Sequence, residues 1–217
     1  MRGLGRNSPC LLDYKHVGNN LRKAFYISIL IILFSCNKGE RIPNPLAIKY
    51  QEKGVSYQME NKADSAVFYY KKAIKLEPTE IAIIESLVKM YWINEQLELA
   101  LKNLNEAPNE IKESNSILTL KGMTLEKMGK LNEAMELYKK AFKESPKIRY
   151  KSEKNVMEFI GYLTLQTIVG EKEKALTEFK KLKEKKMSES EKQYINSIET
   201  IIKNYKGGGY NGILGNK

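Results

Sequence analysis

Residues 115–148 read NSILTLKGMTLEKMGKLNEAMELYKKAFKESPKI, and this stretch decides the fold. Its apolar and small residues recur three and four positions apart, which is the spacing of one face of an α-helix. Gly129 lies where the chain must turn, because glycine tolerates a left-handed backbone. Pro146 ends the second half, since proline cannot continue a helix. The stretch therefore predicts two short amphipathic helices joined by a turn.

Small residues in this stretch predict a close contact between the two helices. Gly122 has no side chain, so a second helix can approach there. Ala134 and Ala141 allow the same approach from the second helix, and Tyr138 fills the gap between them. Neither helix can bury its apolar face alone, so further helices are expected beside them.

The same spacing recurs along most of the chain. Residues 47–80, 81–114 and 115–148 abut with a period of 34, and a fourth copy fits residues 156–189 after an insertion at 149–155. The matching residues are Tyr50, Gly54, Tyr57, Asn61, Ala66, Tyr70, Ala73 and Pro78 in the first copy, Ile84, Val88, Tyr91, Glu95, Ala100, Leu104 and Ala107 in the second, and Phe159, Leu163, Gly170, Ala175 and Phe179 in the fourth. This pattern resembles the tetratricopeptide repeat (TPR) family.

The resemblance implies an all-α fold, a TPR-type helical solenoid of four helix-turn-helix repeats over residues 47–189. Residues 190–205 carry an apolar stripe and are predicted to form a C-terminal end helix, with Ser190 as its N-cap. Three glycines end this helix at residues 207–209. Residues 206–217 are expected to form a flexible tail.

A signal sequence is predicted before the repeats. Residues 21–37 read LRKAFYISILIILFSCN, in which two basic residues precede an apolar run that is too short to cross a bilayer. This pattern is typical of a secretory signal. The run ends at Leu33-Phe34-Ser35-Cys36, which resembles a bacterial lipobox, although Phe34 departs from the residues commonest at its position. In such a motif the cysteine is acylated and becomes the first mature residue.

We therefore expect a signal peptide over residues 1–35, a lipid on Cys36 and a short tether over residues 36–46. Residues 1–20 are an unusually long front for such a signal, and we expect them to be a mis-assigned extension with translation starting at Leu21. The expected location is the bacterial cell envelope, as an outer-membrane lipoprotein held by the lipid on Cys36.

Catalytic chemistry is not expected. The only histidine, His16, and one of the two cysteines, Cys10, precede the predicted cleavage site, and Cys36 would carry the lipid. The mature chain would then lack the commonest general base, the commonest transition-metal ligand and a thiol nucleophile. No phosphate-binding loop or nucleophile elbow is present in the sequence. We predict no enzyme activity, no cofactor and no metal site.

The formal net charge of +11 raises the question of a polyanionic partner. Acidic residues alternate with lysines on the predicted helix surfaces, which indicates solvated faces with local ion pairs. The densest basic run, residues 180–186, is interpreted as the wet face of the fourth repeat, with Leu182 pointing inward. Nucleic acid is not expected as a partner.

The resemblance implies a concave groove lined by the first helix of each repeat. At about 100° per residue, positions 2, 5, 9 and 12 of that helix lie together, away from its buried face. The predicted protein-binding residues are Gln58, Glu85, Lys89, Trp92, Met123 and Glu126. Their mixed character suits a helix or an extended segment with apolar anchors. Clamp-type members of the family grip a C-terminal carboxylate with a set of Lys, Asn and Arg that this sequence lacks.

Trp92, the only tryptophan, has two interpretations: a binding hot spot beside Lys89 and Met123, or packing between the second and third repeats. For the whole chain, the resemblance implies an envelope scaffold that binds protein or peptide partners. One alternative is a self-associating structural subunit whose groove accepts residues 206–217 of a neighbour. Another is an accessory lipoprotein of an uptake or secretion system.

Overall fold

The computed structural model describes residues 42–145, 156–185 and 187–214. The predicted signal peptide, Cys36 and the insertion at 149–155 lie outside the described residues. Within these residues every regular element is a helix, and none of the helices is long and apolar enough to cross a membrane. The helices are α2 (Pro45–Met59), α3 (Ala63–Leu76), α4 (Ile81–Ile93), α5 (Leu97–Asn105), α6 (Asn109–Lys112), α7 (Asn115–Lys127), α8 (Leu131–Glu144), α9 (Val156–Ile168), α10 (Lys172–Lys183), α11 (Glu189–Asn204) and α12 (Gly209–Leu214).

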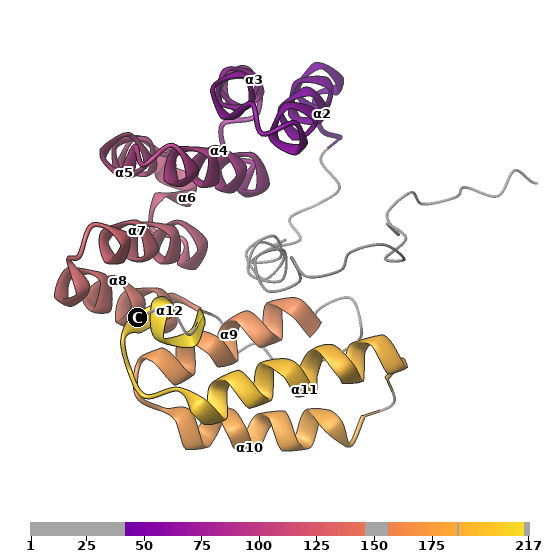
Figure 1. Ribbon diagram of the computed structural model, residues 1–217, viewed down its shortest axis with the longest axis vertical. Helices are drawn as coiled ribbons and strands as arrows, with labels where there is room; N and C mark the ends of the chain where they lie inside the picture. Colours follow the sequence, from indigo (N-terminus) through magenta and orange to yellow (C-terminus); the bar gives the residue numbers. More distant parts are fainter. Residues whose placement is uncertain (1–41, 146–155, 186, 215–217) are drawn as a thin grey trace, which may run out of the picture.

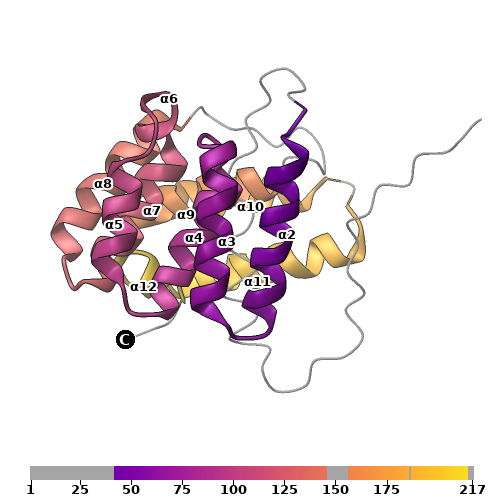
Figure 2. The same ribbon diagram turned by 90° about the horizontal axis from the view of Figure 1, so that it is seen from above.

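The helices stack as pairs in chain order, which confirms the predicted all-α solenoid. The pairs are α2–α3, α4–α5, α7–α8 and α9–α10, and each pair packs against the next (Figure 1). Figure 2 shows α2 and α3 side by side in front of the later pairs. In Figure 1 the array curves so that α4 and α7 lie on its inner side and α5 and α8 on its outer side.

The turn inside each pair has the same backbone geometry in all four pairs. Counted from the first residue of each 34-residue copy, the residue at position 15 always has a positive φ. The angle is 57° at Asn61, 57° at Glu95, 78° at Gly129 and 97° at Gly170. The next backbone N–H then reaches back over the turn, for example from Lys130 to the carbonyl oxygen of Leu125 at 2.9 Å. This closure satisfies a carbonyl that the end of a helix would otherwise leave unpaired. The 34-residue period is therefore a backbone repeat, even where glycine is absent.

The predicted close contacts inside the pairs are confirmed. A Cβ added to Gly122 would lie 2.4 Å from Cε1 of Tyr138, and one added to Gly54 would lie 2.6 Å from Cε1 of Tyr70. Both tyrosines and Ala134 are fully buried. The tyrosine ring thus occupies the space that glycine leaves open, which explains why glycine and tyrosine occur together in the first and third pairs.

The second pair is closed differently. Its second helix, α5, has 9 residues, against 14 in α3 and in α8. Pro108 follows soon after α5 and precedes the single turn of α6. The early proline therefore shortens the second helix, and α6 leads the chain into α7.

The end helix begins at Glu189, one residue before the predicted start at residue 190. Its N-cap is Ser188 rather than Ser190, because Ser188 and Glu191 form a reciprocal capping box in which each side chain accepts the other's backbone N–H. At the other end of α11, Lys172 Nζ donates to the carbonyl oxygens of Lys203 (2.6 Å) and Tyr205 (3.1 Å). The lysine at the start of α10 therefore holds the last turn of α11.

The prediction of a flexible tail was wrong for residues 207–214. The chain turns after α11 and forms α12, which packs against α7, α8, α9 and α11. Tyr210 and Ile213 are buried in the same apolar cluster as the third and fourth pairs. Three successive positive φ angles, 109°, 93° and 60° at Gly207, Gly208 and Gly209, make this reversal and are open only to glycine without strain.

Candidate concave binding site

The predicted groove positions fall into an accessible part and a covered part. On α2, Ile48 and Val55 are 40% and 43% exposed, and Gln58 is partly buried. On α4, α7 and α9, most of the equivalent positions are buried, including Glu85, Lys89, Met123 and Glu126 among the predicted residues. The six predicted residues therefore do not form one continuous open surface.

Gln58 and Glu126 hold equivalent places in the first and third pairs. The hydroxyl of Tyr70 donates to Gln58 Oε1 at 2.8 Å, and the hydroxyl of Tyr138 donates to Glu126 Oε2 at 2.6 Å. In each case the tyrosine follows its acceptor by 12 residues. In these two pairs, the tyrosine of the second helix therefore fixes the orientation of the side chain at position 12 of the first helix.

Glu126 has further partners, because the chain's own C-terminal segment sits on it. Its Oε2 accepts the backbone N–H of Tyr210 at 2.9 Å, and its Oε1 accepts the N–H of Asn211 at 2.6 Å. The carboxylate therefore caps the first turn of α12 while Tyr138 holds it from the other side. Burial, together with the negative charge of Glu126, raises the pKa of Tyr138 well above its usual value, so this hydroxyl stays a donor.

The aromatic rings of this site also meet. The centroids of Tyr138 and Tyr210 are 5.3 Å apart with their planes at 63°, an edge-on arrangement that favours aromatic contact. The hydroxyl of Tyr210 is buried and has no hydrogen-bond partner among the described residues. The segment thus combines well-placed backbone donors with one polar group that the site does not satisfy.

Glu85 and Lys89 form a buried pair on α4. Their charged atoms lie 3.9 Å apart, and their side chains are only 5% and 10% exposed. Burial raises the pKa of Glu85 to about 7, an effect that the charge of Lys89 only partly offsets, and burial lowers the pKa of Lys89. Glu85 and Met123 line the same small hollow between α4 and α7. The pair is therefore part of a helix interface rather than an open cationic site.

Trp92 packs between the second and third pairs. Its indole Nε1 donates to Thr124 Oγ1 on α7 at 3.1 Å, and it touches the apolar clusters on both sides. Lys127 Nζ lies 5.4 Å from the ring, within the range of a cation–π contact. These contacts favour the packing interpretation over the hot-spot interpretation.

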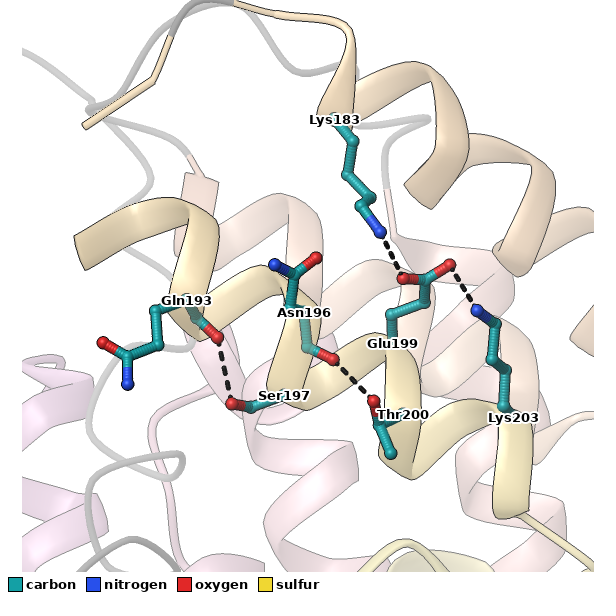
Figure 3. A network of polar contacts seen from close by, with 7 residues as sticks. All are labelled: Lys183, Gln193, Asn196, Ser197, Glu199, Thr200 and Lys203. Carbon is teal, nitrogen blue, oxygen red and sulfur yellow. Dashed lines mark hydrogen bonds and ion pairs between the residues drawn. The ribbon is translucent and has the colours of Figure 1, made fainter. Parts of the chain in front are cut away.

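A second polar network joins α11 to the end of α10 (Figure 3). Glu199 accepts from Lys183 at 2.7 Å and from Lys203 at 3.0 Å. The hydrogen bond from Lys183 is the main cause of a lowered pKa at Glu199. Leu182 is buried, as predicted for the basic run at 180–186, so this run joins α10 to α11 through Lys183.

Tyr138, Tyr210 and the glycines at 207–209 are the residues that sequence reasoning did not assign to the site. The sequence feature that could have identified this segment is a run of three glycines followed by an aromatic residue. Such a run fits an ordered turn as well as it fits a flexible tail. No group of three or more His, Cys, Asp or Glu residues among the described positions could hold a metal ion.

Comparison with known proteins agrees with this geometry. The family model described as a tetratricopeptide repeat matches residues 47–80 and 116–148, whereas a search of curated proteins finds no match. The matched segments are the first and third helix pairs, which carry both the glycine and the tyrosine. All-helical repeats of this kind are typically binding modules and not catalysts. The chain therefore contains tetratricopeptide repeats at these two positions, and its other helix pairs continue the same solenoid.

Proposed function

We propose that this protein is a lipid-anchored scaffold of the bacterial cell envelope that binds other proteins through its concave groove. The observation that carries the binding role is the match of two helix pairs to tetratricopeptide repeats, since these repeats generally bind protein partners. The anchoring role rests on the sequence from Arg22 to Cys36, with its basic start, its short apolar run and its terminal cysteine.

The accessible part of the groove lies on α2. Ile48 and Val55 offer exposed apolar anchors there, and Gln58 beside them is fixed by Tyr70. Apolar anchors next to an oriented amide suit a helical or extended protein segment. Photo-crosslinking tests this site directly. A photo-crosslinking residue at Val55 should capture a discrete partner in membranes, whereas one at Lys139, which is exposed on α8, should not. Equal capture from both positions would contradict a groove-specific role.

The anchor is tested at the cysteine. Replacing Cys36 by serine should abolish incorporation of labelled fatty acid and move the protein from the membrane to the soluble fraction, since a multiply acylated terminus holds a protein firmly at a bilayer. Cys10→Ser is the matched control, because it removes the other cysteine and should change neither result. A Cys36→Ser protein that stays in the membrane with unchanged mass would contradict the anchor.

Self-association is a second candidate function. It is favoured by the fit of the chain's own residues 207–214 to the site on Glu126, because a neighbour's segment could make the same contacts. Sedimentation over a hundredfold range of concentration separates the two: a mass that stays at one protomer throughout would contradict self-association.

A further inference from the structure

The C-terminal segment lies against the array in the manner of a bound peptide. Two of its backbone N–H groups donate to the carboxylate of Glu126, and two of its side chains, Tyr210 and Ile213, are buried between the helices. None of these contacts comes from a neighbouring turn of the same helix. Glu126 and Tyr210 are 84 residues apart in the chain.

The glycines of the segment are required by this docked conformation. A Cβ at Gly209 would lie 2.4 Å from Glu126 Oε2, and one at Gly212 would lie 1.9 Å from the carbonyl oxygen of Gly207. Four glycines among six residues, all placed where a side chain would strain the backbone or collide, indicate a segment shaped for this site.

The same segment is also easy to release. Ordering three consecutive glycines costs more conformational entropy than ordering other residues. The buried hydroxyl of Tyr210 has no hydrogen-bond partner among the described residues, which destabilises the docked state. On release, this hydroxyl would form hydrogen bonds with water. The receiving side stays formed without it, because Tyr138 still donates to Glu126 from within the third pair.

We propose that residues 207–214 are an internal ligand of the groove. They fill a peptide-binding site built on Glu126 and Tyr138, and they leave it when a protein partner offers the same chemistry: two consecutive free backbone N–H groups after a glycine turn, the first of them on an aromatic residue. This inference rests on the proposed function, which it refines by naming the kind of partner and the competitor that it must displace.

The test uses a labelled synthetic peptide of residues 206–214 and the full chain. Gly212→Val should release the internal segment without altering Glu126, because the added side chain would collide with Gly207. Fluorescence anisotropy should then show the peptide binding at least about tenfold more tightly to the Gly212→Val chain than to the wild type, whose own segment competes at high effective concentration. Adding Glu126→Gln to the released chain should weaken binding by about tenfold or more, since the charge-assisted acceptor is lost.

Two controls make the result specific. A peptide with valine in place of Gly209 should not bind, whereas Glu133→Gln on the exposed face of α8 should leave binding unchanged. If the Gly212→Val chain fails to fold, hydrogen exchange on the wild type replaces it: excess peptide should speed exchange at the amides of Tyr210 and Asn211. A folded Gly212→Val chain without saturable binding, or amides that excess peptide leaves protected, would overturn the proposal.

The outcome is separate from that of the proposed function. If the peptide does not bind while a crosslinker at Val55 still captures a partner, the internal ligand is refuted and the scaffold role stands. If the peptide binds only to a dimer of the chain, the segment is one that two copies of the chain exchange with each other. The proposal of an external partner is then refuted.

Discussion

Replacing Gly122 by alanine adds one carbon where the two helices of the third pair touch. That carbon would lie 2.4 Å from Cε1 and 2.8 Å from Cδ1 of Tyr138, whereas carbon atoms in favourable contact are about 3.5–4.0 Å apart. The ring is fully buried and its hydroxyl donates to Glu126, so it cannot move aside and keep that bond.

Three contributions set the expected size of the effect. Overpacking a core site costs about 1–3 kcal/mol, and losing a hydrogen bond to a charged group costs about 1.5–3 kcal/mol. Alanine favours a helix over glycine by about 1 kcal/mol, which offsets part of this loss. We expect the free energy of unfolding of the Gly122→Ala chain to fall by about 2–4 kcal/mol.

Urea unfolding followed by the emission of Trp92 measures this loss, because the indole contacts Thr124 on the same helix as Gly122. Circular dichroism should give a coincident transition if unfolding is two-state. The matched control is the same change in a Tyr138→Leu background, which copies the Val88 and Leu104 combination of the second pair. The penalty should disappear there. An unchanged penalty without the ring, or none with it, would refute the reasoning.

Glu95→Gly should raise the free energy of unfolding by about 1 kcal/mol, since Glu95 holds a φ of 57° that glycine adopts freely; a loss of stability in urea would contradict this. Trp92→Ala should lower it by about 3 kcal/mol in thermal melts, because the ring packs between two helix pairs, and an unchanged melting temperature would return the residue to a binding role. Glu85 has a folded pKa raised to about 7 from 4.5, so the stability of the wild type relative to Glu85→Gln should be greatest below about pH 4.5 and fall by up to about 3 kcal/mol as the pH rises through 7. A pH-independent difference in urea titrations would show that Glu85 is not buried as described.

The architecture could be predicted because it is written in local spacing. Gly122 and Tyr138 are 16 residues apart within one helix pair, and the turn at Gly129 between them closes on its own neighbours. Each pair repeats these relations, so one readable copy predicts the others. The left-handed turn at Glu95 shows how strongly the repeat imposes its backbone on a residue that does not favour it.

The site was harder to predict because it depends on contacts between distant parts of the chain. Helical periodicity placed Trp92 and Glu126 on the inner face, but not what covers that face. The contact between Glu126 and Tyr210 depends on three glycine torsions in sequence, and composition alone cannot separate such a turn from a loose tail. Burial of Glu85 likewise follows from its neighbours across the hollow rather than from its own helix.

The two ends of the array are finished differently. Helices α11 and α12 close the C-terminal end, whereas α2 packs chiefly on α3 and leaves Met59 79% exposed. Repeat arrays come apart unit by unit, and the first pair is held by the fewest interfaces. If Cys36 carries the proposed lipid, tension between the membrane and a partner would enter the chain at this pair. Unfolding residues 45–76 would release about 100 Å of extended chain. The first pair could then lengthen under tension while the site on Glu126 stays folded.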